Sequence, residues 1–580
     1  MAGRSGAVHV VTTKRRYKDK VYQAHLLRRS YRESGKVKNE TVANLSHLPE
    51  HVVALIRGSL RGQRFVEVEE AFEIESSPQH GHVQAALGAM RALGMADVIG
   101  SRPSRQRDLV MAMVAARIIS PRSKLATTRW WHRTTLPREL GVEDATEDDL
   151  YAAMDWLLAR QPAIEKKLAG RHLRKDGLVL YDLTSSYFEG KRCPLAAIGH
   201  SRDRKKGTLQ VNYGLVTDEF GCPVSVSVFR GNVGDSTTLL GEVSKVRSQF
   251  GIQSLVLVGD RGMITQSQID KLVESTKREI DWITALRSPA IRKLVNGGAL
   301  QLGLFDERNL FELTHPDYPG ERLVACRNHD LAEHRAHKRR ALLEATVKKL
   351  EAIQRSVESG RLRGKDKIGI RVGKVLDSHK VGKHFQLEIE RNRFRFQIAK
   401  EKVAAEAALD GIYVVRTSLS KKMMGGPGVV LAYKRLSTVE RAFRSMKTVD
   451  LHVRPIRHWS EDRVRAHIFL CMLAYYVQYH MQEAWRSLLF FDEEAWITKR
   501  DDPVAPAKRS LSADSKASTR VNDDGHPVHS FRTLLDDLAG IVRNRCRRKG
   551  ATTDEPPFEI LTRPTALQLQ ALELVSAIST

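Results

Sequence analysis

The sequence predicts an α/β fold, with a central sheet covered by helices on both faces. Two runs rich in Val and Leu, residues 178–181 and 255–259, have the length and composition of strands buried on both faces. Between them, residues 209–216 and 224–229 alternate as further strands. Three antiparallel strands followed by alternating helices and strands are the layout of a ribonuclease-H-like core.

Each of the two buried runs is followed by an aspartate, Asp182 after the first and Asp260 after the second. A helix over residues 236–250 leads to the second run, another helix begins near Thr265, and residues 282–286 form a further strand. In open α/β sheets, ligands bind at the carboxyl ends of the strands. We therefore expect both aspartates at the functional edge of the sheet.

A glutamate far downstream, Glu440, is the third carboxylate of interest. Its apolar neighbours recur at helical spacing: Val439, Phe443 and Met446. Arg444 and Lys447 follow four and seven residues after it, so one helical face carries a carboxylate and two cations. Alone, this pattern is more typical of a solvated, salt-bridged face. With the two aspartates, it predicts a helix that packs beside the first and fourth strands.

Three sequence blocks occur in order along the chain: residues 181–185 (YDLTS), residues 258–263 (VGDRGM), and residues 433–447, followed by the segment RPIRHWSEDRVRAH. In the third block, Tyr433, Glu440 and Lys447 are spaced by seven residues. On these blocks the chain resembles the DDE transposases of bacterial insertion sequences, in the branch of the insertion-sequence-four superfamily with a long insertion before the Glu. It departs from the usual pattern at Leu436, where the family has Arg, and at Thr265, where an aromatic residue is common.

The resemblance implies a two-metal site made by Asp182, Asp260 and Glu440, with Asp182 bridging both ions. Carboxylates suit this chemistry because hard cations such as Mg²⁺, for which Mn²⁺ can substitute, prefer oxygen ligands. Such a site would cut a DNA strand at the element end and let the freed 3′-hydroxyl attack another phosphodiester. Tyr433 and Lys447 would hold the phosphate at the transposon end, with Arg444 a further candidate.

A basic loop over residues 199–207 leaves the strand that carries Asp182. Most such loops are only solvated, but this one opens toward the expected metal site. We therefore hypothesise a phosphate contact from one of its cations: Arg202, Arg204 or Lys205. Two competing carboxylates have other expected places, because Asp235 precedes a Ser-Thr-Thr run and should cap a helix, and Asp203 should lie in the mobile loop.

The composition predicts a soluble DNA-binding protein. The net charge is +27 and the isoelectric point is about 9.9, which favours a polyanionic partner, with nucleic acid as the first choice. The five cysteines show no C-x-x-C spacing, so neither a zinc site nor a disulfide framework is predicted. No run has the length of a membrane span or a signal core, so we expect a cytoplasmic, nucleoid-associated protein.

At 580 residues the chain is too long for one core, and we expect six regions. They are a basic β-rich module over 1–75, a helical DNA-binding domain over 76–175, the first part of the catalytic core with both aspartates over 176–290, a β-rich insertion domain over 291–404, the second part of the core with the Glu440 helix over 405–495, and a linker with a helical basic tail over 496–580. The first module has fourteen Lys or Arg against seven Asp or Glu up to residue 70. A DNA-end contact and a basic surface hairpin are equally compatible with it.

Three functions are compatible with these sequence features. The first is an active DNA transposase that binds double-stranded element ends and target DNA as a homodimer. The second is a transposase-derived DNA-binding protein without catalysis. The third is a structure-specific nuclease on the same core. Three carboxylates argue against the second, because simple DNA binding does not require buried acidic residues beside a polyanion.

Overall fold

The computed structural model describes residues 6–18, 20–63, 65, 67, 71–203, 205, 207–276, 279–301, 303–492, 503–505, 509–552 and 554–579. The chain divides into two compact units. The smaller contains Met1–Ser77 and Arg543–Thr562, and the larger contains Pro78–Val542 and Arg563–Thr580. In the described part of the chain, no helix is both long and apolar enough to cross a membrane.

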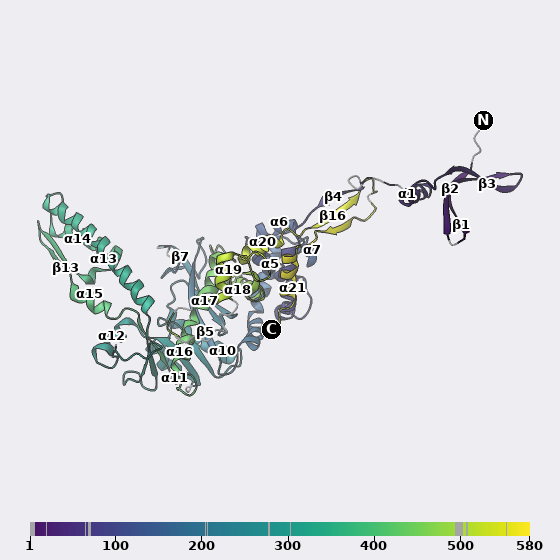
Figure 1. The fold of residues 1–580 in the computed structure, drawn as a ribbon. Coiled ribbons are helices and arrows are strands. Elements are labelled where there is room, and N and C mark those ends of the chain that lie inside the picture. Colours follow the sequence, from purple (N-terminus) through teal and green to yellow (C-terminus); the bar gives the residue numbers. More distant parts are fainter. Residues whose placement is uncertain are drawn as a thin grey trace. The chain divides into compact units, whose positions relative to one another are not determined.

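The smaller unit begins with an antiparallel meander of β1 (Ala7–Tyr17), β2 (Lys20–Glu33) and β3 (Lys36–Asn44), followed by α1 (Glu50–Leu60). These strands confirm the β-structure expected near the N-terminus. A second sheet joins the two ends of the sequence: β4 (Phe72–Ser76) pairs with β16 (Arg543–Arg548), which also pairs with β17 (Phe558–Leu561) (Figure 1).

The strand β16 corrects the prediction of a helical basic tail. Alternation along the strand places Arg545 and Arg547 on one face, where both form ion pairs with Glu75 on β4. Cys546, between them, is fully buried. The basic run is therefore stable as a strand because the acidic partner strand compensates its charge, a pairing that local sequence does not reveal.

The central sheet of the larger unit has the order β8-β7-β5-β9-β10, continued by β15, β12 and β11, with the short β6 also on β7. The strands are β5 (Leu178–Tyr187), β6 (Ala197–Ile198), β7 (Leu209–Thr217), β8 (Pro223–Arg230), β9 (Leu255–Val258), β10 (Ile280–Ala285), β11 (Leu310–Leu313), β12 (Arg322–Arg327) and β15 (Ile412–Thr417). β5, β7 and β8 are antiparallel, whereas β9 and β10 run parallel to β5. This mixed α/β arrangement is consistent with a ribonuclease-H-like core.

Helices connect and cover this sheet. They are α10 (Asp235–Ser248) and α11 (Gln266–Thr276) around β9, then α16 (Gly426–Lys434), α17 (Leu436–Arg444), the π-helical turn η3 (Ser445–Val449) and α18 (Glu461–Ala484). The helix α17 packs against β5, as predicted for the segment that carries Glu440. Ser460 caps α18 with its side chain, and α18 is buried along most of its length.

Within the larger unit, the described residues before β5 form a helical region. Its helices are α3 (Gly81–Ala92), α4 (Met95–Ile99), α5 (Arg105–Ile119), α6 (Lys124–Trp130), α7 (Leu136–Glu139), α8 (Glu147–Ala159) and α9 (Gln161–His172). Thr146 starts α8 with a capping box, so the acidic run at residues 147–149 lies in the first helical turn, where negative charge is favourable. α5 and α8 pack on α18, and all of these helices belong to the same compact unit as the sheet. The helical region and the sheet thus share one hydrophobic core.

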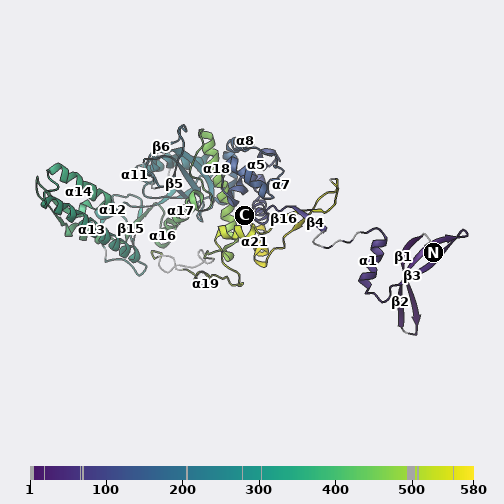
Figure 2. The ribbon, with the colours of Figure 1, turned by 90° about the horizontal axis from the view of Figure 1, so that it is seen from above.

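The region between β10 and β15 is richer in helix than the predicted β-rich insertion. It contains α12 (Ser288–Asn296), α13 (His329–Glu358), α14 (Lys365–His379), a hairpin of β13 (Phe385–Ile389) and β14 (Phe394–Ile398), and α15 (Lys400–Ala407). The helices α13 and α14 run side by side (Figures 1 and 2). Apolar residues at helical spacing on α13, such as Leu350 and Ile353, form a small core with Phe385 and Phe394 of the hairpin. The remaining strands, β11 and β12, instead extend the central sheet.

The C-terminal part also differs from the predicted linker. It contains α19 (Leu511–Thr519), α20 (Phe531–Leu538) and α21 (Ala566–Ser576), while residues 493–502 and 506–508 lie outside the described residues. Lys516 on α19 is almost fully buried, and its ammonium donates to the carbonyl oxygens of Arg486 and Phe491. This polar, Ser-rich segment can therefore pack within the larger unit, because its lysine donates hydrogen bonds to carbonyl groups there. Composition alone does not predict such a contact.

Candidate active site

The strand register brings the two aspartates to the same level of the sheet. Leu180 on β5 lies opposite Val258 on the parallel strand β9, so Asp182 and Asp260 are each two residues beyond this pair. β9 ends at Val258, and Asp260 follows it. β5 continues to Tyr187, paired there only with β7, so Asp182 lies inside a strand and not at its end as predicted.

The helix α17 positions Glu440 by burying its apolar face. Val439, Ala442 and Phe443 are buried against the sheet, and the Phe443 ring meets the Tyr213 ring of β7 edge to face, with centroids 5.8 Å apart. Glu440 itself is exposed. The helix thus fixes the glutamate on the side that faces the two aspartates.

All three carboxylates line one cleft of roughly 1110 Å³. Its other lining residues are Leu183, Thr184, Arg202, Asp203, Asp235, Met263, Asn328, Leu331, Tyr413, Tyr433, Lys434, Leu436, Ser437, Phe443, Arg444, Lys447, Thr448 and Arg454. Asn328 and Leu331 stand at the start of α13, so the region inserted into the core contributes to the wall of the cleft.

The Asp182 carboxyl keeps its proton to a much higher pH than an exposed aspartate does. Burial raises the pKa of Asp182 from 3.8 to about 7, and the negative charges of Asp260 and Glu440 act in the same direction. The Leu183 amide, which donates to Asp182 Oδ1 at 2.8 Å, and the Arg202 guanidinium oppose this rise. Ionising Asp182 is therefore costly mainly because the carboxyl is buried, and a bound cation would offset that cost.

The donor set fits a hard divalent cation. Asp182, Asp260 and Glu440 offer carboxylate oxygens only, the ligand type that Mg²⁺ and Mn²⁺ prefer. The Arg261 amide donates to Asp260 Oδ1 at 2.7 Å, and the Leu183 amide donates to Asp182, so neighbouring backbone groups orient both aspartates. The three residues could together hold such ions.

The predicted phosphate-binding residues have different positions. Tyr433, Arg444, Lys447 and Arg202 line the cleft. Lys205 is exposed outside the set of lining residues, with its ammonium 3.4 Å from the centre of the Tyr187 ring. Arg204 lies outside the described residues. The structure thus brings four of the six candidates to the carboxylates.

The partner of Arg202 is Asp235, a residue that we expected from the sequence to cap a helix. The Arg202 guanidinium forms an ion pair with Asp235. The prediction that Asp235 caps α10 is wrong: the cap position is Gly234, without a side-chain cap, and Asp235 lies in the first turn. The Asp235 side chain is therefore free to reach back to the loop that carries Arg202.

Sequence reasoning missed Asp203 and Arg454. Asp203 was expected in a mobile loop, but its side chain is only 2% exposed. Its carboxylate accepts from Lys447 Nζ at 3.1 Å and from the Tyr187 amide at 2.9 Å, and it forms an ion pair with Arg454. Burial lowers the pKa of Lys447, and Asp203 opposes this effect. Arg454 belongs to the RPIRH block, whose position after the Glu440 helix was the available signal.

The basic residues beside Leu436 are engaged elsewhere. Lys434 donates to the carbonyl oxygens of Val504 and Ala505, at 2.6 and 3.0 Å, and Arg435 forms an ion pair with Glu219. Neither side chain replaces the missing arginine at position 436 in this structure.

Two family models match the chain. One, described as the IS1634 family transposase, N-terminal domain, matches residues 10–70. The other, described as the transposase DDE domain, matches residues 174–477, slightly more than half of the chain. The chain belongs to the DDE transposase family. This match includes Asp182, Asp260 and Glu440, and it confirms the resemblance to transposases of insertion sequences.

Membership in the transposase family establishes a nucleic-acid-processing enzyme. DDE transposases bind DNA and generally use divalent metal ions, in agreement with the basic charge and with the all-oxygen donor set of the cleft. No curated protein matches the chain.

Proposed function

We propose that this transposase binds insertion-sequence ends, cleaves DNA strands and joins the freed 3′-hydroxyl to target DNA. The observation that supports it is the meeting of Asp182, Asp260 and Glu440, from three distant parts of the sequence, in one cleft with the cations Arg202 and Arg444. A module that only bound DNA would gain nothing from three acidic groups beside a polyanion. The acidic cluster makes chemical sense where a cation lies between it and a phosphate.

Asp182, Asp260 and Glu440 would hold two Mg²⁺ ions, for which Mn²⁺ can substitute. When bound, such ions activate the attacking oxygen and stabilise the charge on the departing one. The raised pKa of Asp182 supports this assignment, because it identifies a carboxylate whose negative charge the protein alone compensates poorly.

The remaining cleft residues bind and orient the DNA backbone. Burial and the neighbouring carboxylates raise the pKa of Tyr433 to about 12, so its hydroxyl keeps its proton at neutral pH and donates to a phosphate oxygen. Arg444 is exposed at the cleft and offers several N–H groups to a phosphate. Arg202, Arg204, Lys205 and Lys447 would add positive charge around the same strand.

The parts outside the core would bind double-stranded DNA. The basic first 75 residues would contact the element ends, the helices over 76–175 would take part in end recognition, and the basic face of α13 would hold DNA over the cleft. The net charge of +27 supports a large DNA contact. A homodimer would hold two element ends together, and a DNA substrate would place the protein at the bacterial nucleoid.

The test is cleavage of labelled DNA that carries the element's own ends, with Mg²⁺ or Mn²⁺. We expect wild-type protein to cut at the ends and to produce strand-transfer products, and Glu440→Gln to bind the same DNA without cutting. The matched control is Glu274→Gln, an exposed position on α11 outside the cleft, which should cut normally.

Three other outcomes would contradict the proposal. Binding without cutting by all proteins under either metal would favour a DNA-binding protein without catalysis. Cutting without strand transfer would favour a nuclease. Normal cutting by Glu440→Gln would show that this glutamate is not part of the site.

A further inference from the structure

A second group of side chains whose spacing could hold a metal ion lies outside the cleft of the three carboxylates. Among the residues that the structure describes, one group of three His, Cys, Asp or Glu residues has its ligand atoms all within 4.8 Å of one another. It is not the three carboxylates but His172, Cys222 and His480. Cys222 is buried, and the two histidines are half-buried.

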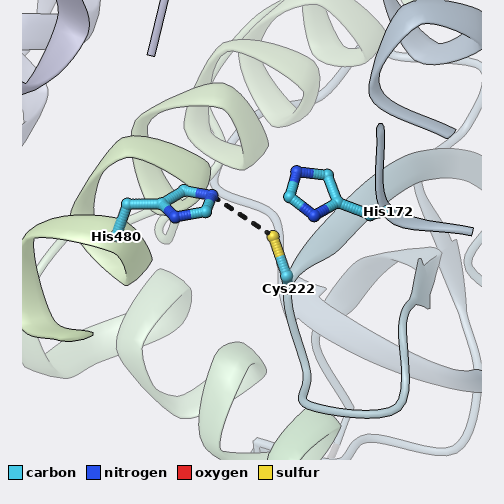
Figure 3. Close-up of side chains that lie close together, drawn as sticks. All are labelled: His172, Cys222 and His480. Carbon is cyan, nitrogen blue, oxygen red and sulfur yellow. Dashed lines mark hydrogen bonds between the residues drawn. The ribbon is translucent and has the colours of Figure 1, made fainter. Parts of the chain in front are cut away.

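The three side chains come from separate elements of the larger unit and point toward one another. His172 is the last residue of α9, Cys222 directly precedes β8, and His480 lies on α18. Both imidazole rings are turned toward the Cys222 sulfur (Figure 3). The fold thus brings together residues that are far apart in the sequence.

The spacing suits a tetrahedral metal ion. Cys222 Sγ lies 3.7 Å from His480 Nε2. With a zinc–sulfur bond of about 2.3 Å and a zinc–nitrogen bond of about 2.05 Å, tetrahedral geometry separates these two atoms by roughly 3.6 Å. An ion could therefore bind between them with almost no change in their separation.

The groups around the cluster resemble those that orient metal ligands. His172 Nε2 lies 3.0 Å from the Tyr476 hydroxyl, which leaves Nδ1 of the same ring for an ion. The Cys222 amide donates to Asp218 Oδ1 at 2.9 Å, and the Phe220 amide donates to the same oxygen at 2.9 Å. Asp218 thus fixes the turn that presents the sulfur.

The histidines are in the form that binds metals. Burial lowers the pKa of His172 to about 4 and that of His480 to about 3, so both are neutral at physiological pH. Burial raises the pKa of the Cys222 thiol, so metal binding at this site would release a proton from sulfur.

We propose that His172, Cys222 and His480 bind a Zn²⁺ ion with a structural role. One thiolate and two imidazoles form a donor set for borderline-soft ions and not for Mg²⁺, and three protein ligands leave a fourth position for solvent. The ion would join α9, the turn between β7 and β8, and α18. Since α9 leads into β5 and α18 packs on β8, this link would stabilise the framework that carries Asp182.

The first test uses the full-length protein, stripped with a chelator and then supplied with Zn²⁺. After removal of free metal, elemental analysis should find about one Zn²⁺ per chain in the wild type and less than about a tenth of that in Cys222→Ser or His480→Gln. The matched control is Cys326→Ser, which removes a buried cysteine of β12 and should retain the ion.

A carboxylate double variant separates this site from the catalytic cleft. Asp182→Asn/Glu440→Gln should keep the Zn²⁺, whereas a cleft-bound ion would be lost from it. Co²⁺ added in place of Zn²⁺ should give a thiolate-to-metal charge-transfer band in this double variant and none in Cys222→Ser. If Cys222→Ser does not fold, His172→Gln gives the same comparison through a half-buried position.

The thermal midpoint provides a readout that does not depend on catalysis. Zn²⁺ should raise the midpoint of unfolding in the wild type and in Cys326→Ser, and should leave that of Cys222→Ser unchanged. Equal Zn²⁺ content in wild type and Cys222→Ser, loss of the ion from the carboxylate variant alone, or no retained Zn²⁺ in the wild type would each overturn the proposal. The last result would leave an ordinary buried Cys–His contact.

Discussion

The ammonium group of Lys447 lies 3.1 Å from a carboxylate oxygen of Asp203, although 244 residues separate the two in the sequence. Their side chains are 10% and 2% exposed, so this ion pair is buried beside the cleft of the three carboxylates. It ties the turn after the Glu440 helix to the loop that carries Arg202. Because charged groups lose hydration on burial, removing one partner leaves the other uncompensated.

We expect Asp203→Asn to lower the free energy of unfolding by about 3 kcal/mol, since Lys447 and Arg454 would both lose their anion. Urea unfolding followed by tryptophan fluorescence measures this change. Glu189→Gln is the matched control, because it breaks an exposed ion pair with Arg457 and should cost less than about 1 kcal/mol.

A double variant tests whether the loss comes from the ion pair itself. Asp203→Asn/Lys447→Met should be less destabilised than the sum of the two single variants, with a coupling of about 1–3 kcal/mol. Strictly additive losses would mean that Asp203 stabilises the loop through its other contacts.

Removal of the Asp182 charge should stabilise the metal-free protein at high pH. The carboxyl ionises near 3.8 when unfolded, whereas burial raises its pKa to about 7 in the folded protein. Folded-state stability therefore falls as the pH rises from about 4 through 7, because only the unfolded state ionises easily. Asp182→Asn should have a higher thermal midpoint than wild type at a pH of about 8, and a smaller gain, about half as large, at about 5.5.

Differential scanning fluorimetry with a chelator present measures both midpoints. Asp270→Asn, an exposed position on α11, is the control and should not change the pH dependence. A gain for Asp182→Asn that is equal at both pH values would contradict the assignment of the effect to ionisation.

Metal binding in the cleft should weaken in acid. An ion must displace the proton of Asp182, so its affinity should fall by about tenfold for each pH unit below about 7. Titration of Mn²⁺, with free ion measured by electron paramagnetic resonance, gives this slope. A wild-type affinity that does not change between pH values of about 5.5 and 7.5 would contradict the prediction.

Arg444 should contact a phosphate when DNA is bound. Arg444→Ala should weaken binding of element-end DNA and of unrelated DNA alike, and should reduce the slope of log affinity against log salt by about 1. Fluorescence anisotropy over a range of salt concentrations measures the slope. The matched control is Lys166→Ala on α9, which removes an equal charge outside the cleft and should leave the salt slope unchanged. A change limited to element-end DNA would instead indicate base recognition.

The sequence predicted the strands and helices around the carboxylates because burial on both sheet faces leaves long apolar runs. The same reasoning ended β5 too early. Beyond Asp182 the strand contains Ser185 and Ser186, which are fully buried, and their hydroxyls bond the Arg202 amide and the Tyr213 hydroxyl. Polar residues that are buried because their hydroxyls are hydrogen-bonded interrupt the apolar run by which a buried strand is recognised in a sequence.

Contacts between distant segments account for the other differences. The ion pair of Asp203 with Lys447, and the cluster of Cys222 with His172 and His480, depend on side chains from separate elements. Spacing rules detect ligands that share one helix or loop, so the scattered cysteines suggested no metal site. Likewise, nothing local indicated that β11 and β12 would extend the central sheet.

The paired strands β4 and β16 are synthesised at very different times. Glu75 and Arg547 are 472 residues apart, so the first strand of this sheet leaves the ribosome tens of seconds before its partner exists. The contact order of the smaller unit is correspondingly high. A transcript cut short after Glu440 would still encode all three carboxylates of the cleft, yet its product would leave β4 unpaired. Completion of the smaller unit therefore requires translation to continue through β17, more than a hundred residues beyond Glu440.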